Sequence, residues 1–410
     1  MSDDRTFVII GAGQAGAWAI YALRDEAEFE GKIVLIGDED YIPYERPPLS
    51  KSAMLGDTSV EDAYFWPREK YDEWNVEMRL GVRAETIDRA AKSVTLSDGA
   101  TIAYDRLLIA TGTRPRLLPI EGKELSGVHY LRTIADTLAI QNDIPDGGSA
   151  LIIGGGWIGL EVAGALSKRN CKATVVELAD RLCGRAVPPE ISDWLLSFHQ
   201  GHGVDVRLNT GVERLIGKDG KLAAAELPGG EIIDCTLAII GIGVLPNCEI
   251  AEAAGLDIDN GVVVDAQGRT SDPDIFAAGD LTNHPNALLG RRIRLESWEN
   301  AQNQGRVAAK AMAGKAEDYA EIPWFWSDQF DANIQMIGVP QSWEQLATRG
   351  DPASEEFITF YLKDGKIDGA ISVNYARDIR MAKRLMQAGK QVSAEDLSNP
   401  DIKLQALLKG

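Results

Sequence analysis

Two glycine-rich turns, one near residue 11 and the other near residue 154, are the features of this sequence that most directly indicate chemistry. Each turn follows a short apolar run and shows the spacing G-x-G-x-x-G, with Gly11, Gly13 and Gly16 in the first and Gly154, Gly156 and Gly159 in the second. In such a motif the first glycine permits a tight turn, the second lets the backbone approach a pyrophosphate, and the third lets the following helix lie close to the strand. Because the pyrophosphate then meets the positive N-terminus of the helix, the repeated motif predicts two bound dinucleotides rather than two unrelated turns of an ordinary α/β sheet.

An acidic residue closes the second strand of each of these units. Asp38 follows the apolar run 33–36, and Glu177 follows the run 173–176. A carboxylate at this place accepts hydrogen bonds from the ribose hydroxyls of a dinucleotide. Glu177 would also repel a 2′-phosphate, so the sequence predicts NADH as the electron donor. Arg181 lies four residues after Glu177 and leaves some use of NADPH open.

The composition bounds the classes of function. The 410 residues are enough for two or three domains, and 62 acidic against 42 basic residues argue against non-specific binding to nucleic acid or to an anionic membrane surface. No apolar run reaches the length of a membrane span, and the N-terminus does not resemble a signal peptide, so we expect a cytoplasmic protein. Four cysteines without a C-x-x-C pair and four scattered histidines predict neither a disulfide framework nor a metal site.

The elements that must position these residues follow from the apolar periodicity. The first part of the chain predicts a helix over 17–24, a hairpin over 94–102 with an Asp-Gly turn, and a strand over 106–110. Further on, we expect an edge-like strand over 291–296 and a helix over 298–313 that is capped by Ser297. The smaller C-terminal part predicts strands over 333–339, 357–362 and 367–373 and helices over 376–388 and 402–408.

A stiff segment over 41–51, with three prolines between residues 43 and 48, makes a resemblance to a known family specific. Together with the two glycine turns, it resembles the FAD-dependent ferredoxin reductases that serve bacterial Rieske-type oxygenases and cytochromes P450, which have a glutathione-reductase-like flavoprotein fold. The resemblance spans essentially the whole chain. It implies an α/β protein with two Rossmann-like domains and a C-terminal α+β domain: FAD over 1–115 and 246–323, NAD(P)H over 116–245, and the last domain over 324–410.

The same resemblance implies which residues bind the two cofactors. For FAD it implies Gly11, Gly13, Ala15, Gly16, Asp38, Arg46, Pro47, Lys51, Ala84, Ala110, Thr111, Gly112, Arg132, Gly279, Asp280, Ser297, Trp298 and Trp324. For the nicotinamide dinucleotide it implies Gly154, Gly156, Trp157, Ile158, Gly159, Glu177, Gly241, Ile242 and Gly243. Asp280 would bind a ribityl hydroxyl, and the helix after Ser297 would aim its N-terminus at the flavin pyrimidine. Trp324 belongs to a Trp-Phe-Trp cluster that either lies near the flavin or is part of the core.

Lys51 and Glu161 are the two residues that the resemblance places at the contact between nicotinamide and flavin. A cation there would stabilise the negative charge that the flavin gains, and the carboxylate would neutralise that cation in the resting state. Neither residue is expected to act as an acid or base, because hydride transfer needs no proton relay. The alternative is an ordinary surface lysine and a glutamate favoured by the start of its helix.

The function implied is that of an NADH-dependent ferredoxin–NAD(+) reductase. Hydride would pass from NADH to FAD, and two single electrons would then reach a [2Fe–2S] ferredoxin that serves a ring-hydroxylating dioxygenase or a cytochrome P450. No cysteine precedes Cys171, so a thiol relay after the first glycine turn is not expected. Two alternatives stay open, namely a monodehydroascorbate or quinone reductase and a redox-sensitive binding module similar to apoptosis-inducing factor. The oligomeric state is expected to be a monomer or a homodimer.

Docking of a ferredoxin on so acidic a chain requires a local basic surface. Two clusters are candidates: Arg291, Arg292 and Arg294 on a strand, and Arg377, Arg380, Lys383 and Arg384 on a C-terminal helix. Either cluster would also be compatible with a simple solvated face.

Overall fold

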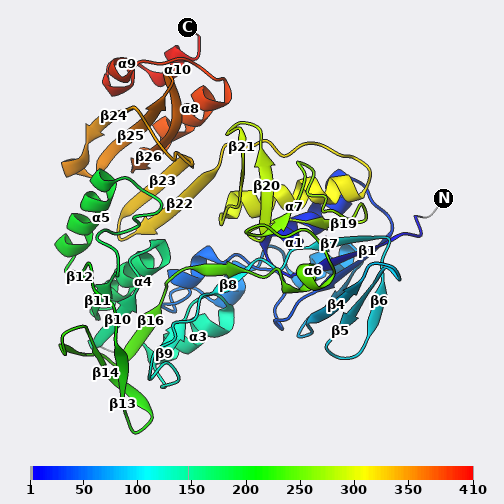
Figure 1. The fold of residues 1–410 in the computed structure, drawn as a ribbon, viewed down its shortest axis with the longest axis horizontal. Coiled ribbons are helices and arrows are strands. Elements are labelled where there is room, and N and C mark those ends of the chain that lie inside the picture. The colour runs from blue at the N-terminus through cyan, green and yellow to red at the C-terminus, as the bar shows by residue number, and fades with distance from the viewer. Residues whose placement is uncertain (1–2, 146, 410) are drawn as a thin grey trace.

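The computed structural model describes residues 3–145 and 147–409 and shows three parts grouped around a common centre (Figure 1). The first part is built on a five-stranded parallel sheet with the order β19-β7-β1-β2-β3. Its strands are β1 (Thr6–Ile10), β2 (Lys32–Ile36), β3 (Val76–Arg79), β7 (Arg106–Ile109) and β19 (Ile275–Ala277). Because β19 joins this sheet from far along the sequence, the chain leaves the first part and later returns to it.

The second part repeats this architecture. Its five-stranded parallel sheet has the order β12-β11-β10-β16-β9, so β10 and β11 take the places of β1 and β2. The strands are β9 (Val128–Tyr130), β10 (Ser149–Ile153), β11 (Lys172–Val176), β12 (Asp205–Arg207) and β16 (Leu237–Ile240). The central strands of both sheets are apolar and buried, because helices cover one face of each sheet and a small antiparallel sheet covers most of the other.

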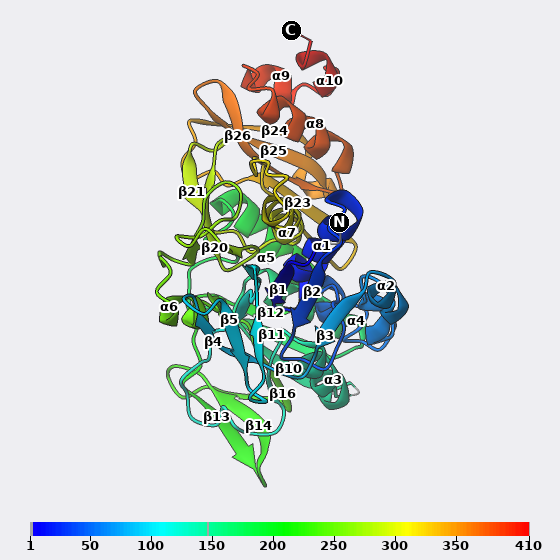
Figure 2. The same cartoon turned by 90° about the vertical axis from the view of Figure 1, so that its right-hand side faces the viewer.

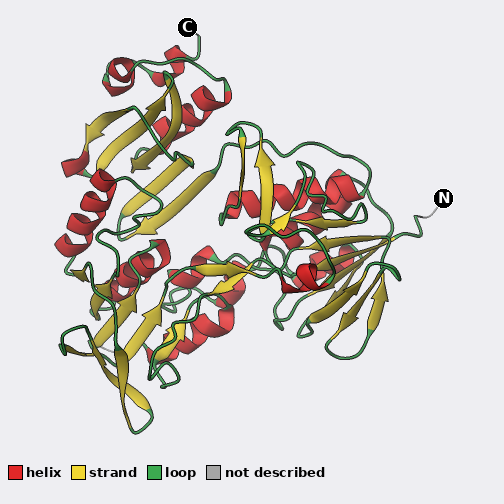
Figure 3. Cartoon of the chain, in the orientation of Figure 1, coloured by secondary structure: helices red, strands yellow, loops and turns green. Residues whose placement is uncertain are grey.

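Helices cover these sheets, as Figure 3 shows in red. In the first part α1 (Gln14–Tyr21) packs against α7 (Trp298–Met312), and α2 (Arg68–Glu73) and α6 (Glu249–Ala253) lie nearer the edges. In the second part the helices are α3 (Ile134–Asp143), α4 (Trp157–Lys168) and α5 (Pro189–Gly201). The first helix begins at Gln14, earlier than the predicted 17–24, and continues as a π-helical turn over Ala22–Glu26.

Small antiparallel sheets fill the space between and beside the large ones. β8 (Thr113–Pro115) pairs with β17 (Val244–Pro246), and this pair carries the chain out of the first part and back into it. The other strands are β4 (Ala84–Asp88), β5 (Ser93–Leu96), β6 (Thr101–Ala103), β13 (Arg214–Lys218), β14 (Lys221–Glu226), β15 (Ile232–Asp234), β18 (Val262–Val263), β20 (Thr282–Asn286) and β21 (Arg291–Ile293). The predicted hairpin over 94–102 is confirmed by β5 and β6, while β21 is shorter than the strand predicted over 291–296.

The third part is a five-stranded antiparallel sheet with the order β22-β23-β26-β25-β24. Its elements are β22 (Trp324–Gln329), β23 (Ala332–Gly338), β24 (Gln345–Asp351), β25 (Glu356–Lys363), β26 (Lys366–Val373), α8 (Ala376–Gln387), α9 (Ala394–Ser398) and α10 (Leu404–Leu407). The predicted strands at 333–339, 357–362 and 367–373 and the helix at 376–388 are confirmed. The prediction missed β22, the mostly polar edge strand β24 and the short α9, and it made α10 too long.

One hydrophobic core joins the second and third parts. Leu195 and Phe198 of α5 belong to the same buried cluster as Phe357 and Ile371 of the antiparallel sheet. Trp194 adds an edge-to-face contact with Phe357, with ring centroids 5.7 Å apart. The C-terminal sheet is therefore held in a fixed position above the second part (Figure 2).

Among the helices that the structure describes, none is both long enough and apolar enough to span a membrane.

Candidate functional site

A cavity of about 1080 Å³ lies where the carboxyl ends of the first sheet meet α4 and the strand β22. Ligands of doubly wound α/β folds bind at this end of the strands. Most of the residues that we predicted for the FAD site line the cavity: Gly11, Gly13, Ala15, Asp38, Arg46, Pro47, Lys51, Ala84, Ala110, Thr111, Gly112, Arg132, Gly279, Asp280, Ser297 and Trp298. From the second part, Trp157, Ile158 and Glu161 reach the same cavity.

The first glycine turn has the geometry of a pyrophosphate cradle. Gly11 has φ +117°, and a Cβ atom there would lie 2.2 Å from the Ala110 carbonyl oxygen. A Cβ at Gly16 would lie 2.1 Å from the carbonyl oxygen of Gly11, so Gly16 allows the helix to approach the strand and does not itself line the cavity. At Gly13, by contrast, a Cβ would meet no described atom within 4 Å. The space above Gly13 thus fits a pyrophosphate group at the uncapped N-terminus of α1.

The second glycine turn has the same geometry outside this large cavity. Gly154 has φ +117°, a Cβ at Gly159 would lie 2.1 Å from the Gly154 oxygen, and a Cβ at Gly156 would again meet no described atom within 4 Å. Residues 241–243, also predicted for this cradle, follow β16 beside it, and a Cβ at Gly154 would lie 2.4 Å from the Gly241 oxygen. The second cradle therefore fits another dinucleotide.

Glu177 is fixed at the floor of the second cradle. Its Oε2 accepts a hydrogen bond from the Gly155 amide at 2.7 Å, and its Oε1 accepts one from the Ala179 amide at 2.8 Å. Arg181, which could have bound a 2′-phosphate, instead donates to the carbonyl oxygens of Val187 at 2.6 Å and Gly184 at 2.5 Å. The carboxylate is thus in place for a ribose, while the guanidinium is already engaged by the backbone.

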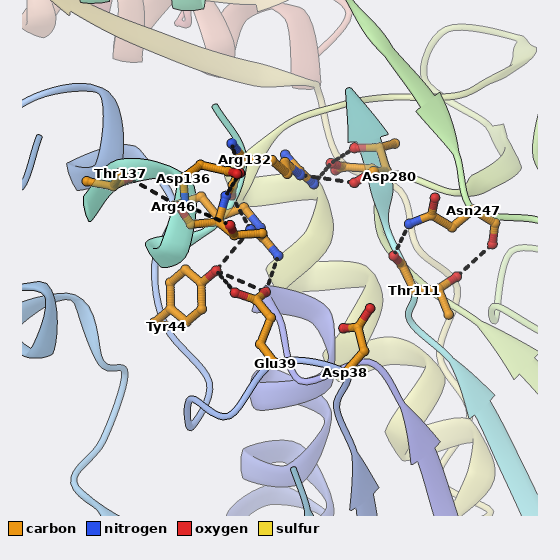
Figure 4. A network of polar contacts seen from close by, with 12 residues as sticks. Asp38, Glu39, Tyr44, Arg46, Thr111, Arg132, Asp136, Thr137, Asn247 and Asp280 are labelled. Carbon is orange, nitrogen blue, oxygen red and sulfur yellow. Dashed lines mark hydrogen bonds and ion pairs between the residues drawn. The ribbon is translucent and has the colours of Figure 1, made fainter. Parts of the chain in front are cut away.

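Arg132 and Asp280 lie together in the first cavity (Figure 4). The Arg132 guanidinium donates to Asp280 at 3.2 Å and to the Thr113 carbonyl oxygen at 3.0 Å. Burial and the neighbouring charge of Arg46 lower the pKa of Arg132, and Asp280 partly offsets both effects. Two adjacent, partly exposed guanidinium groups make this wall suitable for an anionic ligand.

Glu39 and Tyr44, which were not among the predicted site residues, complete the network in Figure 4. Glu39 accepts a hydrogen bond from the Tyr44 hydroxyl at 2.7 Å and lies 3.5 Å from Arg46, which in turn donates to the carbonyl oxygen of Arg132. Asp38 is exposed and lies 4.0 Å from Arg83. The adjacency of Glu39 to Asp38 was the only signal for it in the sequence, since its contacts with Tyr44 and Arg46 follow no sequence motif.

Lys51 and Glu161 meet at the wall of the cavity where all three parts of the chain come together. Lys51 Nζ lies 3.5 Å from Glu161 Oε1 and 3.1 Å from Asp328 Oδ2. Glu161 is only 6% exposed, and it accepts hydrogen bonds from the hydroxyls of Ser50 at 2.5 Å and Ser327 at 2.6 Å. Burial raises the pKa of Glu161, while Lys51 and both serines counter this rise.

The aromatic residues of β22 differ from the prediction in one position. Phe325 and Trp326 line the cavity, whereas Trp324 does not; its indole stacks on Trp326 with centroids 5.0 Å apart. Trp324 and Trp326 lie on one face of the strand. Of these two residues, only Trp326 lines the cavity, while Trp324 packs behind it.

The N-terminus of α7 also faces the cavity. Ser297 and Trp298 are part of its lining, and the Ser297 hydroxyl accepts a hydrogen bond from the Asn300 amide at 3.3 Å. The cap is the one predicted, and it directs the positive end of a long helix at the cavity.

Comparison with known proteins places the chain in a family. Residues 5–305 match the family model for pyridine nucleotide-disulphide oxidoreductases, and residues 324–408 match the model for a reductase C-terminal domain. The chain belongs to the pyridine nucleotide-disulphide oxidoreductases. Within the family it is 42% identical, over 98% of its length and 99% of the other protein, to the ferredoxin–NAD(+) reductase component of the anthranilate 1,2-dioxygenase system of Burkholderia cepacia.

Other members of the family are similar over the same extent. Rhodocoxin reductase of Rhodococcus erythropolis is 38% identical over 98% of this chain and 93% of its own. The crystal structure of the covalent putidaredoxin reductase–putidaredoxin complex matches with a TM-score of 0.96 and 34% identity, and it covers 100% of this chain and 99% of the other. These matches confirm the family and the glutathione-reductase-like fold class that the glycine turns and the segment 41–51 indicated.

Despite the name of the family, no cysteine of this member lines the cavity. Its four cysteines, Cys171, Cys183, Cys235 and Cys248, are all buried and unpaired. Burial raises the pKa of Cys235 to about 12, which keeps it a thiol at neutral pH. In residues 3–145 and 147–409 no group of three or more His, Cys, Asp and Glu side chains is arranged to hold a metal ion.

Proposed function

We propose that this chain is an FAD-dependent reductase that oxidises NADH and passes electrons singly to a [2Fe–2S] ferredoxin, which serves a ring-hydroxylating dioxygenase or a cytochrome P450. The observation that carries the proposal is the meeting of two dinucleotide cradles at one ion pair, Lys51 and Glu161, in a chain that matches ferredoxin reductases over nearly its whole length. A cytoplasmic location, where NADH is supplied, and a monomeric or homodimeric state belong to the same proposal.

The geometry of the three parts supports a division of labour among them. We assign FAD to residues 1–115 and 246–323, NADH to residues 116–245, and the closing wall of the cavity to residues 324–410. The first cradle, Arg132 and Asp280 would hold FAD, and Gly156 and Glu177 would hold NADH. Bound FAD would supply the central chemistry, because a flavin accepts a hydride from a nicotinamide and releases electrons one at a time.

The side chains of the protein provide orientation, electrostatics and exclusion of water. Trp157 and Ile158, at the start of α4, bring the second cradle to the wall of the first cavity. The Lys51 ammonium and the N-terminus of α7 both place positive charge at the cavity, where negative charge develops during reduction. Trp326 and Phe325 of β22 close the third side and keep water from it.

The surface for the ferredoxin is best sought on α8. Arg377, Arg380 and Arg384 are exposed, and none of them forms an ion pair with any residue that the structure describes. We call these three residues the α8 basic face. Lys383 of the same helix pairs with Glu299 of α7 at 2.8 Å, so α8 lies beside the helix whose start lines the cavity.

The second candidate cluster is used within the protein. Arg292 donates to the Val264 carbonyl oxygen at 2.8 Å, and Arg294 donates to the carbonyl oxygen of Asp280 at 3.1 Å. Arg291 donates to the carbonyl oxygen of Val339 at 2.6 Å. These guanidinium groups hold loops together, which makes them a poorer docking surface than the α8 basic face.

Anaerobic reduction kinetics test the proposed function. The purified protein should carry FAD, its flavin should bleach with NADH, and the reduced protein should reduce a [2Fe–2S] ferredoxin much faster than monodehydroascorbate or a quinone. Faster reduction of either small acceptor would favour the corresponding reductase instead. A flavin that stays oxidised under excess NADH would exclude the ferredoxin reductase and the small-acceptor reductases alike, and it would favour a binding module.

A further inference from the structure

A row of buried polar side chains connects the interior of the second part to Glu161. His199 Nε2 lies 2.8 Å from Gln329 Oε1, Gln329 Nε2 donates to Ser327 Oγ at 3.1 Å, and Ser327 Oγ lies 2.6 Å from Glu161 Oε1. The exposed fractions of these four side chains are 0%, 1%, 0% and 6% in that order. The row begins on α5, crosses β22 of the third part and ends on α4.

The carboxylate fixes the direction of every hydrogen bond in this row. An ionised Glu161 can only accept, so the Ser327 hydroxyl must donate to it. Ser327 Oγ then accepts from the amide nitrogen of Gln329, and the amide oxygen is left facing His199. Since that oxygen can only accept, His199 must carry its proton on Nε2. No described residue lies within hydrogen-bond distance of His199 Nδ1, which agrees with a neutral ring protonated at the other nitrogen.

We propose that His199, Gln329 and Ser327 form a buried relay that positions the ionised Glu161 carboxylate against Lys51. The relay residues are positioning residues, and the consequence of the relay for NADH oxidation rests on the proposed function. Burial lowers the pKa of His199 to about 4, so its ring stays neutral and keeps this orientation throughout the neutral range.

The relay matters because Lys51 has a choice of two carboxylates. Asp328 follows Ser327 on β22 and is half exposed, whereas Glu161 is buried at the cavity wall. Burial favours the protonated form of Glu161, and each hydroxyl that donates to the carboxylate favours the charged form. If Glu161 lost its charge, Lys51 would remain paired with Asp328 alone, on the outer side of the cavity. The relay thereby sets where the ammonium charge lies.

The groups that titrate around Glu161 come from each element packed against it. They are Lys51 from the first part, Asp328 from β22, and Cys183 from the segment after β11. Burial raises the pKa of Cys183 far above neutrality, so the thiol stays uncharged. A hydrogen bond from the Asn333 amide and the charge of Lys51 outweigh burial and hold the pKa of Asp328 below its usual range. The titration should therefore report Glu161 itself.

The test is the pH dependence of flavin reduction by NADH in the FAD-loaded protein, followed by anaerobic stopped flow. Ser327→Ala should shift the acid limb of the profile towards higher pH by about one unit, because one hydrogen bond to the charged form is lost. On the alkaline side the variant should approach the wild-type rate. Ser372→Ala is the matched control, since Ser372 is a fully buried serine of the same sheet with a hydroxyl that pairs with no described residue. Superposed profiles for Ser327→Ala and wild type, or an equal shift in the control, would overturn the relay.

A second variant tests whether the residues act in series. Gln329→Met removes the link between His199 and Ser327 while the Ser327 hydroxyl remains, so a smaller shift of the same sign is expected. The double variant with Ser327→Ala should shift no further than Ser327→Ala alone, because both changes interrupt one chain. Fully additive shifts would mean that the two residues act independently and would contradict the relay.

Two spectroscopic measurements keep this inference separate from the proposed function. Nitrogen-15 NMR of the histidines, with His199 assigned by His199→Gln, should show Nε2 protonated and Nδ1 bare at pH 7. Carbon-13 NMR of the glutamate carboxyls, with Glu161 assigned by Glu161→Gln, should show its titration move upward by about one unit in Ser327→Ala. A wild-type flavin that NADH does not reduce would refute the proposed function and leave these two measurements to decide on the relay. An Nδ1-protonated His199, or an unmoved Glu161 titration, would refute the relay even in an active enzyme.

Discussion

In the proposed function, the choice between NADH and NADPH would depend on two side chains of the second cradle whose hydrogen bonds are already formed. Glu177 is held by the backbone amides of Gly155 and Ala179, so its charge cannot turn away from a 2′-phosphate. Arg181, four residues further on, gives its donors to backbone carbonyl groups. The compensation that the sequence left open is thus not available from Arg181 in this conformation, which strengthens the expectation of NADH.

Glu177→Gln should weaken that preference without abolishing activity. The amide keeps a hydrogen-bond acceptor for the ribose but removes the charge repulsion, so the ratio of kcat/KM for NADH to that for NADPH should fall by about tenfold, which corresponds to roughly 1.4 kcal/mol. Steady-state kinetics with both nucleotides measure the ratio. Glu213→Gln, at an exposed site of the same part, should leave it unchanged. An unaltered ratio in Glu177→Gln would show that discrimination lies elsewhere.

At the level of elements, the two strand–turn–helix units make the same use of three glycines. In each unit the third glycine touches the carbonyl oxygen of the first, and the middle glycine faces open space. The two kinds of position should therefore respond differently to an added methyl group. In Gly16→Ala the added methyl group would clash with the Gly11 carbonyl group and force the helix away from the strand, which costs stability. The middle glycines, by contrast, can accept a Cβ as long as no ligand is bound.

Gly13→Ala and Gly156→Ala together test which cradle holds which dinucleotide. Gly13→Ala should leave the thermal stability of the FAD-free protein unchanged and weaken FAD binding by about tenfold or more, because its methyl group occupies the space for the pyrophosphate. Gly156→Ala should retain FAD and raise the KM for NADH by a similar factor. Flavin content and NADH titration measure the two effects, and each variant is the control for the other. The reverse pattern would exchange the two assignments.

Much of this architecture could be predicted from local patterns. Both cradles, the acids that end their second strands and the cap at Ser297 are short-range features, and the structure shows them at the predicted places. The edge strand β24 was missed because its sequence, Gln345 to Asp351, is mostly polar and contains a glycine. That the cavity reaches Trp326 and not Trp324 could not be predicted, because the strand pattern gives the face of each side chain but not where along the strand the cavity ends.

The surroundings of Glu161 could not have been predicted in the same way. Ser50, Ser327 and Gln329 come from distant segments, and their hydroxyl and amide groups carry no sequence pattern of their own. The packing of the turn Pro47–Ser50 and of β22 against α4 brings them to the carboxylate. The family resemblance supplied Glu161 and Lys51, but the partners that set their charge state are visible only in three dimensions.

At the level of the whole molecule, the charge distribution is uneven. The chain has a net charge of −20, yet the α8 basic face carries three cations that form no ion pair with the described residues, and it lies beside α7, whose start lines the cavity. An acidic partner would be repelled by most of the surface and attracted by the α8 basic face. The orientation of the partner and the rate of encounter should therefore both depend on this face.

Arg380→Glu combined with Arg384→Glu should slow the association of the reduced protein with an acidic ferredoxin. We expect a decrease of about tenfold at low ionic strength and a weaker dependence on salt, while flavin reduction by NADH stays at its wild-type rate. Stopped-flow kinetics over a range of salt concentrations measure both. The matched control is Lys218→Glu with Lys221→Glu, which makes the same change of charge on the hairpin of β13 and β14, at the opposite end of the molecule from α8 (Figures 1 and 2). Equal slowing in both double variants would assign the effect to net charge and remove α8 from consideration.

The core that α5 shares with the antiparallel sheet has a consequence for how such proteins can be recombined. A C-terminal domain exchanged between two relatives would arrive with its own strand in the place of β22, and thus with its own hydroxyl and amide behind Glu161 and its own indole at the cavity. Its underside would also have to match the aromatic surface of α5 around Trp194 and Phe198. Chimeras joined near residue 324 should therefore retain full activity only when that helix is exchanged along with the domain.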